Sequence, residues 1–176
     1  MKKSLFIAFI ILVTACKPKD SEQSRTILEA DLTDNKVLHL TTATDSYTTL
    51  DDLITSNKGK VIYVDVWASW CGPCKQMMPA SAALKERYKD KDVVFIYVSI
   101  DTNIDAWKQS AMSFNLPNEE SFLARNYPKA SFFQNNNVSN IPRYFLYDKT
   151  GRMIDDNAMR PAEQDLANTI DALLSL

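Results

Sequence analysis

Two apolar runs constrain the fold more than any other feature of the sequence. Residues 61–68 (VIYVDVWA) and 93–100 (VVFIYVSI) are rich in β-branched and aromatic side chains and show almost no alternation with polar ones. Runs of this kind are typical of strands that are buried on both faces of a sheet. Because such strands need helices on both sides, we expect an α/β fold. The chain has 176 residues, of which 45% are apolar, enough for one domain of ordinary size.

Shorter patterns place the other elements around these two strands. The expected strands are 37–40, 61–68, 93–100, 143–148 and 152–155, and the expected helices are 73–88, 101–114 and 161–176. Pro73 suits the first turn of its helix, and Pro79 should kink that helix. Residues 50–54 fit a helical turn or a loop, and 117–138 is expected to hold little more than a helical turn at 122–127. This order predicts one mixed sheet that ends in a hairpin.

The N-terminal segment has the composition of a targeting signal. Lys2 and Lys3 precede an apolar run over residues 5–13, which is too short to span a membrane and about right for a signal peptide. The run ends in VTAC, which resembles the lipobox of bacterial lipoproteins. In that family the cysteine, here Cys16, is lipidated and becomes the first residue. The alternatives are an ordinary signal peptide with an incidental cysteine, or a short uncleaved anchor.

The expected domain organisation follows from that signal. Residues 1–16 form a lipoprotein signal peptide, the polar residues 17–28 form a flexible tether, and residues 29–176 form the folded domain. A lipid on Cys16 would anchor the protein to a membrane without spanning it, on the periplasmic or another extracytoplasmic face. The two remaining cysteines would then be the only thiols, in a compartment where thiols tend to become oxidised.

Charge and glycine content exclude several classes of partner. The formal net charge is −2 and no stretch is strongly basic, so we expect no nucleic-acid binding. Three glycines are too few for a Gly-rich loop that would bind phosphate. The sequence therefore gives no reason to expect a cofactor.

The segment WCGPCK at 70–75 places two cysteines where a strand gives way to a helix. Free N–H groups and the helix dipole favour an anion there, so Cys71 should have a pKa below the usual value of about 8.5. Lys75 adds a positive charge one turn on. Cys74 lies on the same side of the helix, and the two sulfurs can close a small disulfide ring. Exchange would take two steps, in which Cys71 attacks a substrate disulfide and Cys74 resolves the mixed disulfide.

Two other interpretations of the cysteine pair are weaker. A structural zinc site needs four ligands, and the sequence offers no second cysteine pair and only one histidine, His39. A purely structural disulfide that spans so few residues would remove little chain entropy and stabilise the fold little. Redox exchange is therefore the favoured interpretation, and no metal is assigned.

The segment VDVWASWCGPCK at 64–75 closely resembles the active-site segment of thioredoxins. The chain as a whole, over 37–176, looks more like the TlpA/ResA-like thiol–disulfide oxidoreductases, which are membrane-anchored. Asp65 matches the buried acid of that family, Pro79 the helix kink, and Ile141-Pro142 the cis-proline loop. The resemblance implies a thioredoxin-like fold in residues 29–176. It has a central mixed sheet flanked by helices, with an insertion in 101–140 before the cis-proline loop.

The resemblance also implies a role for each residue of the site. These roles are Cys71 as nucleophile, Cys74 as resolving thiol, Asp65 as proton acceptor for Cys74, Trp70, Gly72, Pro73 and Lys75 as the active-site turn, and Ile141 and Pro142 as the substrate-binding loop. Pro142 would be cis and would leave the backbone of Ile141 free to pair with an extended substrate strand. The alternatives are a hydrated strand-end acid for Asp65, a packing residue for Trp70 and a trans proline for Pro142.

Other residues are expected to be structural. Thioredoxins carry a lysine near the buried acid, but Tyr97 aligns with it here, so Asp65 would lose a charged partner and its pKa would rise. Trp67 is expected in the core, and His39 in a strand with no catalytic role. Five aromatic residues could line a partner groove but are expected to pack on the core: Trp107, Phe114, Phe122, Phe132 and Phe133.

We expect an anchored reductant of protein disulfides. The Gly-Pro pair between the cysteines resembles that of the reducing thioredoxins, whose reduction potential is about −270 mV. It differs from the pair in strong oxidants such as DsbA, whose reduction potential is about −120 mV. The resemblance implies oxidised proteins or apocytochrome c as substrates and a membrane electron donor as partner. The alternatives are a disulfide oxidase or isomerase, and a thioredoxin-like metal chaperone or adaptor that holds partners in the cis-proline groove.

Overall fold

The computed structural model describes residues 31–176. The predicted signal peptide (1–16), the lipidation of Cys16 and the tether (17–28) lie outside the described residues. Within the described part, no helix combines the length and the apolar character needed to cross a bilayer.

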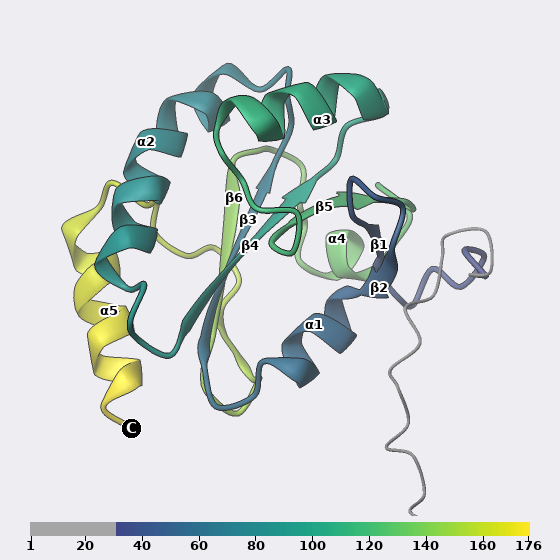
Figure 1. Ribbon diagram of the computed structural model, residues 1–176. Coiled ribbons are helices and arrows are strands. Elements are labelled where there is room, and N and C mark those ends of the chain that lie inside the picture. The colour runs from purple at the N-terminus through teal and green to yellow at the C-terminus, as the bar shows by residue number, and fades with distance from the viewer. Residues whose placement is uncertain (1–30) are drawn as a thin grey trace, which may run out of the picture.

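Seven strands form one mixed sheet. In chain order they are β1 (His39–Thr41), β2 (Tyr47–Thr49), β3 (Val61–Trp67), β4 (Val93–Ser99), β5 (Ser121–Ala124), β6 (Arg143–Tyr147) and β7 (Met153–Asp155). Across the sheet the order is β2-β1-β5-β4-β3-β6-β7 (Figure 1). The three strands β3, β4 and β5 run parallel, whereas all other neighbours pair antiparallel. The predicted mixed sheet and its closing hairpin are thus confirmed.

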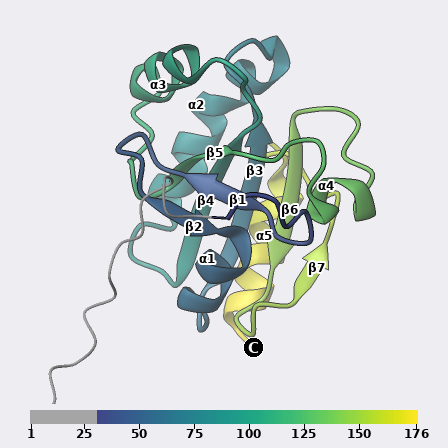
Figure 2. The same ribbon diagram turned by 90° about the vertical axis from the view of Figure 1, so that its right-hand side faces the viewer.

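Helices cover both faces of this sheet. They are α1 (Leu50–Ser56), α2 (Gly72–Arg87), α3 (Ile104–Ser113), α4 (Ser131–Asn135) and α5 (Gln164–Leu174). α2 and α5 lie on one face, while α1 and α4 lie on the other (Figures 1 and 2). α3 lies across the end of the sheet at which β3 and β4 finish. The beginning of α2 lies at that same end, which therefore carries the two cysteines.

The central strand β3 is buried along its whole length, as its composition predicts. Trp67 at its end is fully buried, so its assignment to the core is confirmed. The five aromatic residues of 101–140 that were expected on the core also pack inward. Trp107, Phe122 and Phe133 are buried, and Phe114 and Phe132 pack partly buried against the core.

The helical turn predicted at 122–127 is wrong, because that stretch begins with the strand β5. All four residues of β5 are buried, and the strand fills the gap between β4 and β1. Phe122 pairs with Val98 of β4, and Leu123 pairs with Thr41 of β1. A run of four residues has no periodicity that could distinguish the two structures, and its partners are distant in sequence. The stretch 101–140 therefore contributes a central strand as well as surface.

The remaining differences concern short elements and element ends. The strand predicted at 37–40 begins two residues later, and neither β2 nor α4 was predicted. Residues 50–54 belong to a true helix, α1, because the side chain of Thr49 accepts a hydrogen bond from the Asp52 N–H at 3.0 Å. α3 begins at Ile104 and not at 101, because Asn103 caps it in the same way.

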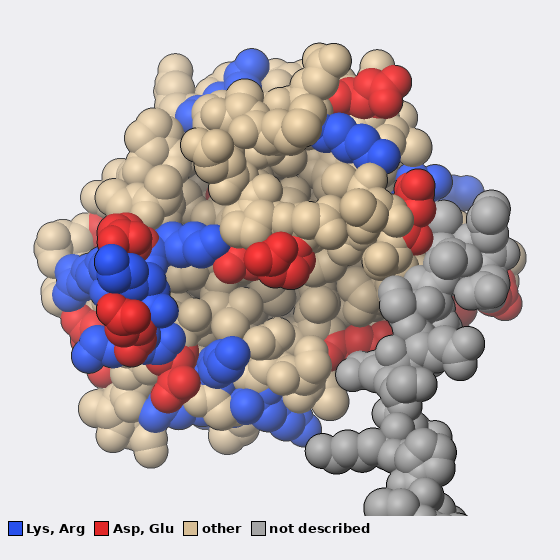
Figure 3. Space-filling view, viewed as in Figure 1, with Lys and Arg blue, Asp and Glu red and all other residues tan. Residues whose placement is uncertain are grey.

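Charged side chains of both signs are mixed on the face shown in Figure 3. They gather over the C-terminal end of α2 and over α5. Arg87 pairs there with Asp171 at 2.7 Å, and Lys89 pairs with Glu86. Positive and negative charges are therefore mixed in this part of the surface, which does not form a patch of one sign.

Candidate active site

Cys71 and Cys74 are joined by a disulfide bond, with their Cα atoms 5.3 Å apart. Cys71 is the N-cap of α2, and Cys74 lies in the first turn, so the bond closes over the start of the helix. Both residues are nearly buried, with 4% and 1% exposure. The pairing is the one that redox exchange requires. Within residues 31–176, no cluster of three or more potential metal ligands is present.

The first turn of α2 directs a backbone N–H at the sulfur of Cys71. The N–H of Cys74 donates to Sγ of Cys71 at 3.1 Å, and the N–H of Lys75 donates to the carbonyl of Cys71 at 3.1 Å. Gly72, Pro73 and Lys75 are exposed, so the turn faces solvent. In the reduced protein, a thiolate on Cys71 would lie at the positive end of the helix dipole, beside an N–H donor.

Asp65 lies in the middle of β3 and is only 2% exposed. The alternative of a hydrated acid at a strand end is therefore excluded. One carboxyl oxygen, Oδ1, has no hydrogen-bond partner within the described chain. Burial disfavours the charged carboxylate and raises the pKa of Asp65 to about 8. A carboxyl group with such a pKa can accept and return a proton near neutral pH.

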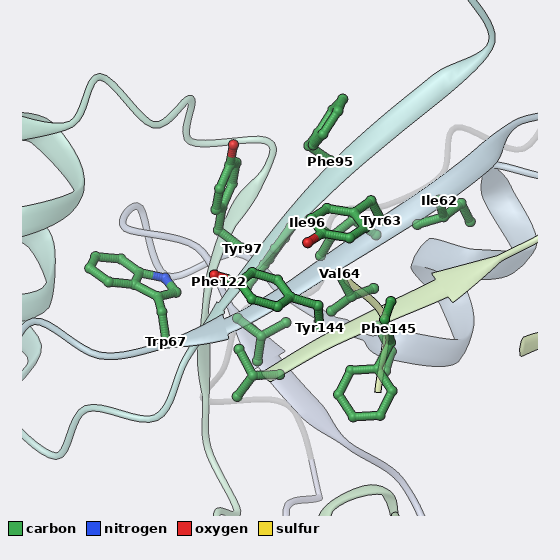
Figure 4. Packing of buried hydrophobic residues seen from close by; sticks show 14 of the residues in the cluster. Ile62, Tyr63, Val64, Trp67, Phe95, Ile96, Tyr97, Phe122, Tyr144 and Phe145 are labelled. Carbon is green, nitrogen blue, oxygen red and sulfur yellow. The ribbon is translucent and has the colours of Figure 1, made fainter. Parts of the chain in front are cut away.

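Tyrosines flank Asp65 on the neighbouring strands. The strand register pairs it with Tyr97 of β4 and with Tyr144 of β6, and paired residues present their side chains on the same face. Figure 4 shows both tyrosines among the buried residues of the sheet. The hydroxyl of Tyr97 bonds to that of Ser81 in α2 at 2.9 Å. Tyr97 thus lies beside Asp65 where the family lysine is expected, and within residues 31–176 no cation offsets the burial of Asp65.

The Ile141–Pro142 peptide bond is cis, as the resemblance predicts. Ile141 lines a hollow of about 200 Å³ that we name the cis-proline hollow. Its lining residues are Trp70, Ile100, Tyr127, Ser139, Asn140 and Ile141. Trp70 is 65% exposed, which argues against the alternative of a packing residue. The hollow therefore brings the predicted substrate loop and the residue before Cys71 to one surface.

The sequence did not point to Asp101, whose carboxylate holds the segment before Cys71 in place by hydrogen bonds. Its carboxylate accepts hydrogen bonds from the N–H of Ser69 at 2.8 Å and from the Oγ of Ser69 at 2.7 Å. Oγ of Ser99 donates a third bond at 2.7 Å. Asp101 is 5% exposed, so these bonds lie out of water and tie the end of β4 to the end of β3. An acid directly after a buried strand is the one sequence signal that could have pointed to it.

His39 lies away from this site, on β1, with β5 and β4 between it and β3. Its Nδ1 is 2.7 Å from the hydroxyl of Tyr47, and its Nε2 is 2.9 Å from the carbonyl oxygen of Asp34. Both ring nitrogens thus have structural partners, and His39 lies in a strand, as predicted.

The chain is similar to known proteins. The family model described as thioredoxin-like matches residues 59–153. Thioredoxin of Coprinus comatus is 42% identical over 50 residues, which are 28% of this chain and 47% of that protein. The thiol–disulfide oxidoreductase ResA of Bacillus anthracis is 29% identical over 98 residues, which are 56% of this chain and 54% of that protein. The chain therefore spans about half the length of the curated relatives it matches.

Solved structures extend the likeness over most of the domain. A candidate thiol–disulfide oxidoreductase from Bacteroides vulgatus is 31% identical, with a TM-score of 0.66 over 78% of this chain and 92% of its own. A candidate thiol:disulfide interchange protein DsbE from Chlorobium tepidum is 30% identical, with a TM-score of 0.58 over 78% of this chain and 93% of its own. The family match at 59–153 covers more than half of the sequence and includes Asp65, the cysteine pair and Pro142. On this evidence the chain belongs to the thioredoxin-like family.

Proposed function

We propose that this chain is a thiol–disulfide oxidoreductase that reduces disulfides in proteins outside the cytoplasm. The observation that carries the proposal is the Cys71–Cys74 disulfide at the start of α2, beside the cis-proline hollow. A bond between two sulfurs next to an open surface can be exchanged with a partner that docks there. The family match and the oxidoreductase relatives support the same chemistry.

The reaction starts from the dithiol form of the protein. The Cys71 thiolate attacks one sulfur of the substrate disulfide, and the other substrate sulfur leaves as a thiolate that takes a proton from solvent. Asp65 then accepts the proton of Cys74, directly or through a water. The Cys74 thiolate attacks Sγ of Cys71, and the second substrate sulfur leaves as a thiolate that takes a proton from solvent. The substrate gains two electrons, and the protein ends with the Cys71–Cys74 disulfide.

The direction of electron flow rests on the two residues between the cysteines. Gly72 and Pro73 resemble the pair found in reducing thioredoxins, and a membrane electron donor would return the protein to the dithiol form. Apocytochrome c is the substrate class that the TlpA/ResA-like resemblance implies, and we include it in the proposal. An apocytochrome offers a pair of cysteines in an unfolded segment, which suits an open docking surface.

The reduction potential tests this direction. We expect the full-length protein, purified in detergent and equilibrated with dithiothreitol redox buffers, to have a potential near that of thioredoxin, about −270 mV. The measurement is the fraction of Cys71–Cys74 disulfide at each buffer ratio, after trapping of free thiols. A potential near that of DsbA, about −120 mV, would overturn the reductant and favour a disulfide oxidase or isomerase.

The location is proposed from the sequence alone. A lipid on Cys16 would hold the thioredoxin-like domain (29–176) at the membrane, with 17–28 as its tether. We expect the protein in the membrane fraction of cells and the Cys16→Ser variant outside it. Membrane association that is unchanged in the variant would contradict lipid anchoring at this cysteine. Cys71→Ser, which leaves the signal intact, is the control and should fractionate like the unaltered protein.

A further inference from the structure

A second hollow adjoins the cis-proline hollow. It measures about 240 Å³, and its lining comes mainly from the N-terminal end of α3 and the C-terminal end of β5. We name it the insertion hollow, because most of its lining comes from the stretch 101–140. Its lining residues are Ile100, Asp101, Thr102, Ile104, Leu123, Ala124, Arg125 and Tyr127. Ile100 and Tyr127 line both hollows, so the two form one continuous surface beside Trp70.

Only two of the residues that line these hollows carry a charge, Asp101 and Arg125. The carboxylate of Asp101 accepts three hydrogen bonds from the serines at positions 69 and 99 and is only 5% exposed, so it is mostly engaged inside the protein. Arg125 is exposed, and its guanidinium has no ion pair or hydrogen bond to any residue in 31–176. The one unpaired charge on this surface, among the described residues, is therefore the positive charge of Arg125.

Arg125 is also held in place by the fold. Its backbone N–H donates to the carbonyl of His39 at 2.9 Å, which extends the pairing between β5 and β1. A planar guanidinium on a fixed backbone can bind a carboxylate with two parallel hydrogen bonds. The surrounding residues Ile104 and Leu123 can contact the aliphatic part of a side chain that reaches the arginine.

We propose that the insertion hollow selects substrate polypeptides that carry an acidic residue a few positions from the reacting cysteine. The inference rests on the proposed function and names its substrate class. A substrate strand that pairs with the cis-proline loop is extended and advances about 3.3 Å per residue. Such a strand passes from Ile141 over Tyr127, and a residue further along it enters the insertion hollow. Arg125 favours aspartate or glutamate there and disfavours lysine.

Peptide substrates test this selection directly. The probe is a set of disulfide-bonded peptides in which one residue, aspartate, asparagine or lysine, is moved stepwise along both sides of the cysteine. The full-length reduced protein is assayed in detergent for kcat/KM with each peptide. At one offset we expect the aspartate peptide to exceed the lysine peptide by roughly 3- to 10-fold at low salt, and the ratio to shrink at high salt.

Two variants identify the residue responsible. Arg125→Glu should reverse the order of the aspartate and lysine peptides at that offset. Lys129→Glu removes an exposed positive charge four residues on that lines neither hollow, and it should leave the order unchanged. Equal rates of both variants with the uncharged hydroxyethyl disulfide, and equal melting temperatures, would show that the redox site and the fold are intact.

The possible results separate this inference from the proposed function. Fast exchange with every peptide and no dependence on the substituted residue would overturn the acidic preference and leave the oxidoreductase in place. A preference that persists in Arg125→Glu would also overturn the assignment to Arg125. No exchange with any disulfide would overturn both proposals.

Discussion

Replacing Cys71 with serine is expected to stop the reduction of protein disulfides, with a loss in turnover of roughly 1000-fold or more. Both cysteines are nearly buried, but Cys71 is the N-cap of α2, where the helix dipole favours a thiolate, whereas Cys74 lies inside the first turn. We therefore expect Cys71 to begin the exchange. Cys74→Ser should still attack a substrate, but no thiol remains to resolve the product, so the reaction should stop at a mixed disulfide.

Mass spectrometry of acid-quenched reactions distinguishes these two outcomes. We expect a covalent adduct between substrate and Cys74→Ser, attached at Cys71, and none with Cys71→Ser. The matched control is Cys16→Ser, which removes the third cysteine of the chain and should keep full turnover in detergent. An adduct on Cys74 in the Cys71→Ser variant would reverse the assigned roles.

The parts of the fold that the sequence predicts are those whose signal is local. The run that became β3 is buried on both faces, and its composition alone indicates this. The start of α2 could be read from Pro73 and the cysteine pair. By contrast, β5 owes its conformation to β4 and β1, which lie far from it in sequence. A four-residue segment is too short to carry a periodic signal, so its structure followed from its partners and not from its own residues.

The residues of the site also differ in whether a local signal in the sequence predicts them. Asp65 is conspicuous in the sequence because a carboxyl group in an apolar strand is costly unless it has a use. Asp101 gave no such signal, since an acid that follows a strand fits the start of a helix equally well. Its three bonds depend on where two separate strands end. Tyr127 and Arg125 reach the site only because β5 lies beside β4. Because the sequence predicted a helical turn in place of β5, neither residue was expected at the site.

Asp65→Asn is expected to stabilise the protein at pH 8 and to have little effect at pH 4. Burial raises the folded-state pKa of Asp65 to about 8 from its ordinary value of 3.8. Between these values the folded state holds a proton that the unfolded state has released. The free energy of unfolding therefore falls as the pH rises through this window, by a total of roughly 5 kcal/mol at its upper end. Asparagine never ionises, so it removes this loss and keeps a side chain of similar size.

Melting temperatures of the oxidised protein between pH 4 and pH 9 measure this effect, with Asp90→Asn as the control for removal of an exposed acid. The gain from Asp65→Asn should grow with pH across the window, and a gain that does not vary with pH would contradict the buried ionisation. The same variant should resolve mixed disulfides more slowly, because asparagine cannot accept the proton of Cys74. A protein that is more stable and slower would show that the fold tolerates a destabilising carboxyl group because the reaction uses it. A variant that is more stable and equally fast would remove Asp65 from the proton transfer.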